Sequence, residues 1–142
     1  MYLLDTNVIS ELRKLGDGRC DPNVERWIAG PADDELHLSV MSIMEIELGI
    51  LRLERRDRKQ AGMLRTWMQD HVEPAFADGI LPMTIDIASR CARLHVPDPR
   101  SERDAWIAAT ALVHDLIVVT RNVADFAETG VSLLNPWDDQ SA

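Results

Sequence analysis

Short apolar runs alternate with longer stretches of helical periodicity along the whole chain. Strands are expected in five places, near Tyr2–Leu4, Glu35–Val40, Ile80–Met83, Leu116–Thr120 and Val131–Leu134. Strands that alternate with helices are typical of an α/β fold with a mostly parallel central sheet. The run Leu116–Thr120 is continuously apolar and β-branched, as expected of a strand that helices cover on both faces.

Helix start signals lie between these runs. Asp21-Pro22 fits an N-cap followed by proline at the first helical position. Ser42 is expected to open a long helix that ends near Leu53, and a further helix is expected from about Lys59 to beyond Trp67. Ser101 is expected to open a helix over residues 102–114, which should be buried because its middle is apolar nearly all round.

Length and hydropathy indicate one soluble domain, residues 1–142. No apolar run approaches the roughly 20 residues that a membrane helix needs. The chain begins directly in a strand-like run, without the charged and apolar regions of a secretory signal. We therefore expect a cytoplasmic protein with no membrane contact.

The balance of charge excludes one simple function class. Fifteen basic and 24 acidic residues give a formal net charge of −9, whereas a simple nucleic-acid binder relies on Lys and Arg to neutralise phosphates. An enzyme that reaches phosphate through a bound metal remains possible, as does a basic partner. The two cysteines, Cys20 and Cys91, are expected to be free thiols.

Acidic residues stand at four of the expected junctions between strands and helices, namely Asp5, Glu45, Asp104 and Asp125. Each has a simple structural alternative. Glu45 and Asp104 fit capping boxes that start at Ser42 and Ser101. Asp5 would cap the helix that begins near Asn7, and Asp125 would be a solvated loop residue. Asp5 is the hardest to explain in this way, because an ionised carboxylate after a buried run is costly to desolvate without a cation.

The positions of the four acids predict that they converge. In a parallel sheet, the carboxyl ends of strands and the N-termini of helices share one edge, where ligands bind. Asp5 and Asp125 follow expected strands, and Glu45 and Asp104 are expected in first helical turns. Converging carboxylates take up protons unless a cation intervenes. Oxygen ligands suit Mg²⁺ or Mn²⁺, so we predict a site for one of these ions, through which an acidic protein could act on a polyanion.

Four segments in order resemble the motifs of PIN-domain nucleases. They are Leu3–Leu12, Leu38–Ile50, Arg103–Ala111 and Val119–Phe126, and the ending Leu134-Asn135-Pro136-Trp137 is similar to a frequent family ending. The resemblance covers nearly the whole chain. It is greatest to the VapC toxins of bacterial toxin–antitoxin pairs, in particular to the FitB-like branch.

This resemblance implies a three-layer α/β/α fold of about five strands, a homodimer and inhibition by a cognate antitoxin. It implies that Asp5 and Asp104 are the principal metal ligands and that Glu45 and Asp125 complete the site directly or through water. Three further residues would hold water or substrate phosphate: Asn7, Thr120 and Asn122. The polar segment 97–103 departs from the family pattern before the third acid, so Glu102 is a further candidate for a place near the site.

The resulting hypothesis is a Mg²⁺- or Mn²⁺-dependent endoribonuclease toxin, in which metal-activated water attacks an RNA phosphodiester. One alternative is the partner-binding half of an autoregulatory complex that contacts DNA through its antitoxin. In this alternative, the groove that binds the partner would form in the paired-helix region Ile43–Trp67 of this chain. The other alternative is a housekeeping RNA-processing nuclease of the same fold. The sequence does not identify the RNA target.

Overall fold

A five-stranded parallel sheet forms the centre of the molecule, as the sequence predicts. The computed structural model describes residues 1–140. The strands are β1 (Tyr2–Leu4), β2 (Leu36–Ser39), β3 (Ile80–Leu81), β4 (Ile117–Val119) and β5 (Ser132–Leu134). Their order is β3-β2-β1-β4-β5, and all four pairings are parallel. The chain builds outward from β1 first on one side and then on the other, so the topological switch point lies between β1 and β4.

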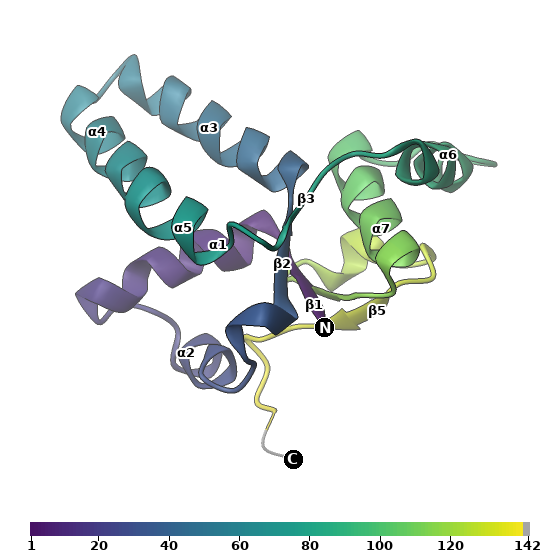
Figure 1. The fold of residues 1–142 in the computed structure, drawn as a ribbon, viewed down its shortest axis with the longest axis horizontal. Helices are drawn as coiled ribbons and strands as arrows, with labels where there is room; N and C mark the ends of the chain where they lie inside the picture. Colours follow the sequence, from purple (N-terminus) through teal and green to yellow (C-terminus); the bar gives the residue numbers. More distant parts are fainter. Residues whose placement is uncertain (141–142) are drawn as a thin grey trace.

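Helices cover both faces of this sheet and complete the three layers (Figure 1). Before β3 the chain forms eight helical elements, which are α1 (Thr6–Leu12), η1 (Arg13–Asp17), α2 (Pro22–Ile28), η2 (Asp33–Glu35), α3 (Val40–Glu54), α4 (Arg58–Trp67), η3 (Met68–Val72) and α5 (Glu73–Ala75). The remaining helical elements are α6 (Ile85–Leu94), α7 (Glu102–His114) and η4 (Val123–Phe126).

Alternation along the strands divides the core between the two faces. Leu3 and Val118 pack with residues of α7, whereas Leu4 and Val119 pack with residues of α1 and α3. All four side chains are completely buried. Since successive side chains of a strand point to opposite faces, two apolar residues in a row are what a strand between two helical layers requires.

Side-chain caps fix where several helices begin. Asp21 and Asp57 accept backbone N–H groups at the starts of α2 and α4, and Thr84 does so at α6. The helix α7 begins at Glu102 and ends at His114, as expected, and Asp115 follows in the left-handed conformation with φ of 55°. Each cap satisfies an N–H group that would otherwise lack a partner in the first turn.

The expected start of the long helix was wrong. The helix α3 begins at Val40, and its N-cap is Ser39, whose hydroxyl accepts the N–H of Met41 at 3.0 Å. The strand β2 ends at Ser39 and therefore passes into α3 without a loop. Ser42 lies inside the helix, so the predicted capping box of Ser42 and Glu45 does not form.

Within residues 1–140, no helix combines the length and apolar character needed to cross a membrane.

Candidate metal and catalytic site

Asp5 occupies the carboxyl end of the central strand and also caps the next helix. Its backbone N–H extends the sheet by donating to Val119 O at 2.9 Å. Its carboxylate accepts the N–H of Thr6 at 2.8 Å, at the start of α1. Only 7% of the residue is exposed. The Asp5 side chain therefore caps α1 and also lies where a metal ligand is expected.

Thr120 and Asn7 hold the second oxygen of the Asp5 carboxylate. The hydroxyl of Thr120, which is completely buried, donates to Asp5 Oδ2 at 2.8 Å and accepts the N–H of Asn122 at 3.0 Å. The amide of Asn7 lies 3.4 Å from both Asp5 Oδ2 and Thr120 Oγ1. Asn7 Oδ1 in turn accepts the N–H of Arg121 at 3.3 Å. This network joins the ends of β1 and β4 across the switch point.

Glu45 reaches the same edge from the second turn of α3, not from its first turn as expected. The hydroxyl of Thr6 donates to Glu45 Oε1 at 3.1 Å. The guanidinium of Arg103 lies 3.7 Å from Glu45 Oε2. Glu45 therefore links three helices, α1, α3 and α7, around the acidic cluster.

Asp104 and Asp125 complete the convergence that the sequence predicts. Asp104 is in the first turn of α7 and half-buried. Asp125 is exposed and lies in η4, where its N–H donates to Asn122 O at 3.0 Å. The charges of Asp5 and Asp125 both raise the pKa of Asp104, which places the three carboxylates within electrostatic range of one another.

The pKa values of Asp5, Glu45 and Asp104 are all raised. Burial is the largest cause that raises the pKa of Asp5, with a further contribution from Asp125, while hydrogen bonds from Thr120 and Thr6 oppose it. Burial also raises the pKa of Glu45, opposed by the hydrogen bond from Thr6, and the charges of Asp5 and Asp104 raise it further. Desolvation and mutual repulsion are the conditions that a bound cation relieves.

The donor set suits a hard divalent cation. All four acids offer carboxylate oxygens, which Mg²⁺ and Mn²⁺ prefer, and Mg²⁺ commonly keeps several waters beside one or two carboxylates. In the part of the chain from residue 1 to 140, no three His, Cys, Asp or Glu side chains are grouped closely enough to form a ready-made metal site. The carboxylate oxygens themselves are of the type that Mg²⁺ and Mn²⁺ bind.

Two side chains at the site were missed in the sequence. Thr6 follows Asp5 and holds Glu45, and Arg103 precedes Asp104 and faces Glu45. Each directly adjoins a predicted acid in the sequence, and this adjacency is the signal that could have identified it. Glu102, in contrast, is exposed and, among residues 1–140, makes no hydrogen bond or ion pair with the side chains of the site. After burial, its charge is the cause that raises the pKa of the Cys91 thiol on α6.

Comparison with known proteins identifies the family of this chain. The profile of the PIN domain matches residues 2–131. The chain belongs to the PIN-domain family. The motifs of this PIN-domain chain that carried the resemblance contain all four acids of the site.

Relatives with similar sequences span nearly the whole PIN-domain chain. VapC ribonuclease Y4jK of Sinorhizobium fredii is 34% identical, over 97% of this chain and 99% of the relative. Toxin FitB of Neisseria gonorrhoeae is 33% identical, over 98% of this chain and all of the relative. The crystal structure of FitAcB from Neisseria gonorrhoeae superimposes with a TM-score of 0.86 at 31% identity, and the match covers 96% of this chain and 99% of that one.

A second solved structure is described as FitAB bound to a DNA fragment. It also gives a TM-score of 0.86 at 31% identity, and the match covers 97% of this chain and 96% of that one. VapBC2 from Rickettsia felis shares the fold at 17% identity, with a TM-score of 0.70.

Proposed function

We propose that this PIN-domain chain is a divalent-cation-dependent endoribonuclease and the toxin of a toxin–antitoxin pair. One observation carries the proposal, namely that Thr6 hydrogen-bonds to both Asp5 and Glu45 at the switch point of the sheet, with Asp104 within electrostatic range of both. The ribonuclease and toxin names of its relatives support the same assignment. Asp5 and Asp104 would hold Mg²⁺ or Mn²⁺, with Glu45 and Asp125 bound directly or through water.

The chain's own residues orient the reaction. Thr120 and Asn7 fix the Asp5 carboxylate, and Thr6 fixes that of Glu45. When bound, the cation supplies positive charge that activates water and offsets the charge of the leaving oxygen. In-line attack of water forms one P–O bond and breaks the bond to O3′, while Glu45 or Asp125 accepts a proton of the water and the leaving O3′ takes up a proton from solvent. The products are a 5′-phosphate and a 3′-hydroxyl.

Cleavage of RNA tests this proposal directly. The chain should cut single-stranded or structured RNA with Mg²⁺ or Mn²⁺ and stop when EDTA is added. The Asp5→Asn variant should lose the activity, whereas Asp86→Asn, an exposed acid on α6, should keep it. Equal cleavage by Asp5→Asn and the unmodified chain would refute the mechanism.

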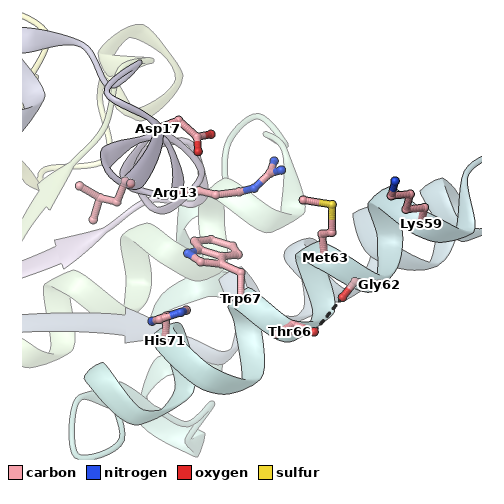
Figure 2. Close-up of a pocket in the computed structure, with 10 residues that line it drawn as sticks. Arg13, Asp17, Lys59, Gly62, Met63, Thr66, Trp67 and His71 are labelled. Carbon is pink, nitrogen blue, oxygen red and sulfur yellow. Dashed lines mark hydrogen bonds between the residues drawn. The ribbon is translucent and has the colours of Figure 1, made fainter.

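We further propose that an antitoxin segment occupies the cavity between η1 and α4 (Figure 2). This cavity has a volume of about 920 Å³ and is lined by apolar side chains such as Leu12, Met63 and Trp67. Arg13 reaches across it towards Met63 in Figure 2. A groove between helices with an apolar floor and a charged rim suits an amphipathic segment. This cavity shares α4 with the predicted groove of the paired-helix region, and its other wall is η1. A smaller cavity of about 270 Å³ lies between α3 and α4 themselves and is lined by Ile46, Leu53 and Trp67 among others.

Gly62 offers a selective test of this partner site. Gly62 lines the cavity, and a Cβ added there meets no atom within 4 Å. Gly62→Trp should fill the cavity and resist inhibition by the small protein encoded beside the toxin, while RNA cleavage continues. Gly62→Ala is the matched control and should remain inhibited. Equal inhibition of both variants would place the partner elsewhere.

We propose that two copies of the chain associate. Met44 and Leu51 lie on α3 and are 41% and 48% exposed, so they form an apolar surface that a second copy would cover. Light scattering should give the mass of a dimer, and Leu51→Glu should give that of a monomer. With a net charge of −9, such a dimer would contact operator DNA through its antitoxin, since the chain itself is a poor polyanion binder.

A further inference from the structure

Arg103 stands at the mouth of the acidic cluster without a firm structural partner. Its side chain is 44% exposed, and its Nη1 lies 3.7 Å from Glu45 Oε2. This separation exceeds the 2.7–3.2 Å of a protein hydrogen bond, so the contact is a loose ion pair. Between residues 1 and 140, it is the one Lys or Arg ion pair made by any of the four acids.

Several other arginines of the chain, in contrast, are engaged in structural contacts. Arg65 donates to both oxygens of Glu47 at 2.9 and 3.1 Å, and Arg100 donates to Leu94 O and Ala127 O. The guanidinium of Arg121 covers the ring of Trp137 at 5.2 Å. Arg103 makes no hydrogen bond to any described residue, so its five N–H groups can turn towards a ligand.

The charge of the cluster identifies the ligand that this guanidinium would accept. Four ionised carboxylates exceed the two positive charges of one divalent cation, so a phosphodiester that approaches the loaded cluster still meets net negative charge. A guanidinium matches the geometry of phosphate and can bind two of its oxygens at once.

We propose that Arg103 is a substrate-binding residue that takes a backbone phosphate of the RNA at the mouth of the site. This inference rests on the ribonuclease function proposed above and adds a specific contact to it. On binding, the guanidinium exchanges its loose pairing with Glu45 for a phosphate, and Glu45 keeps its hydrogen bond from Thr6. Arg103, the last residue of the polar segment before the third acid, thus acquires a role in the chemistry of this chain.

The salt dependence of RNA binding tests this contact without relying on turnover. A short fluorescein-labelled single-stranded RNA is titrated with the otherwise unmodified chain in Ca²⁺, which has the same charge as Mg²⁺ and also takes oxygen ligands, over a series of NaCl concentrations, and anisotropy before cleavage gives Kd. Arg103→Gln should weaken binding about tenfold, the loss typical of a charged hydrogen bond. It should also reduce the slope of log K against log salt by about 0.7, the value for one phosphate of a single strand.

Matched variants separate the contact from its alternatives. Arg93→Gln removes one charge from an exposed position in the last turn of α6 and should change neither Kd nor slope. Arg103→Lys should keep the slope but bind more weakly, because an ammonium cannot bind two oxygens in the fork geometry. In the otherwise unmodified chain, Arg103→Gln should raise KM more than it lowers kcat.

Two results would overturn the inference in distinguishable ways. If the unmodified chain cleaves RNA but Arg103→Gln matches Arg93→Gln in affinity and slope, the contact alone is refuted. A loss of kcat with an unchanged slope would likewise refute it, since Arg103 would then only position Glu45. If the unmodified chain neither binds nor cleaves RNA with Mg²⁺ or Mn²⁺, the proposed function fails and the inference fails with it.

Discussion

Thr120 connects the two strands that flank the switch point through one buried hydroxyl. The hydroxyl donates to Asp5 after β1 and accepts the N–H of Asn122 after β4. Its own N–H donates to Leu134 O, which extends the pairing of β4 with β5. A hydrogen bond to a buried carboxylate is stronger than one between neutral groups. Thr120 therefore contributes to stability and to the orientation of the site at the same time.

Replacing this hydroxyl by a methyl group should be costly. Thr120→Val keeps the shape of the side chain but leaves the Asp5 carboxylate and the Asn122 N–H short of partners, so it should lower the free energy of unfolding by about 2 kcal/mol. Thr120→Ser keeps the hydroxyl and should cost less, through the lost methyl group alone. Urea unfolding of the three proteins measures this difference. Equal losses in Val and Ser variants would show that packing, not the hydrogen bond, is what matters.

The raised pKa values of Asp5, Glu45 and Asp104 make stability depend on pH in an unusual direction. Their ordinary values are 3.8 for Asp and 4.5 for Glu. Above these values, and up to the raised pKa, the folded protein holds protons that the unfolded chain has released. The free energy of unfolding of the metal-free protein should therefore fall as the pH rises through this window.

Urea unfolding in EDTA, from about pH 4.5 to 7, checks the direction of this dependence. Asp104→Asn should make the curve flatter than that of the unmodified chain, whereas the exposed control Asp86→Asn should leave its shape unchanged. A metal-free protein that becomes steadily more stable towards pH 7 would contradict the contribution of the acidic cluster.

At the scale of elements, the junction of β2 and α3 is where the chain reaches Glu45. Ser39 ends the strand, caps the helix and is 1% exposed, and Ser42 is completely buried with a hydroxyl that has no partner in the described chain. Because the helix starts at Val40, Glu45 falls in its second turn and faces Thr6. If the helix began after Ser42, the Glu45 side chain would instead cap the N-terminus of the helix.

Alanine substitutions distinguish the two serines. Ser39→Ala removes the cap of α3 and should destabilise the protein by about 1 kcal/mol. Ser42→Ala removes a buried hydroxyl without a partner and introduces a better helix former, so it should be neutral or stabilise by up to about 1 kcal/mol. Thermal and urea unfolding of the pair measure the contrast. A capping box at Ser42 would give the reverse order.

Local patterns predicted the elements well and their exact contacts poorly. The five strands were found because apolar runs are short and the sheet is covered on both faces, and α7 was placed to the residue by its cap and apolar middle. The pattern Ser-x-x-Glu at Ser42 gave a wrong helix start because the same pattern also occurs in the interior of helices. The approach of Arg103 to Glu45 joins α7 to α3, so it depends on how these helices pack. The sequence shows only that Arg103 adjoins Asp104.

At the scale of the whole molecule, the chain order of the sheet explains why distant acids meet. The strands β1 and β4 are neighbours although more than half of the sequence separates them, and α7 ends just before β4 begins. Asp5, Asp104 and Asp125 therefore come from separate segments that one edge of the sheet brings together. The repulsion between these acids lowers the free energy of unfolding of the whole domain. A ligand that relieves this repulsion therefore raises it.

Divalent cations should therefore raise the melting temperature of the entire chain. A ligand that binds only the folded state adds about 2.7 kcal/mol at a concentration of 100 times its Kd. The shift with Mg²⁺ or Mn²⁺ should be larger at pH 7 than at pH 5, because protons compete for the carboxylates at the lower pH. Differential scanning fluorimetry at rising metal concentration measures it, with Asp5→Asn expected to show little response and Asp86→Asn a full one. A shift of equal size in the Asp5→Asn protein would mean that the cation binds outside the acidic cluster.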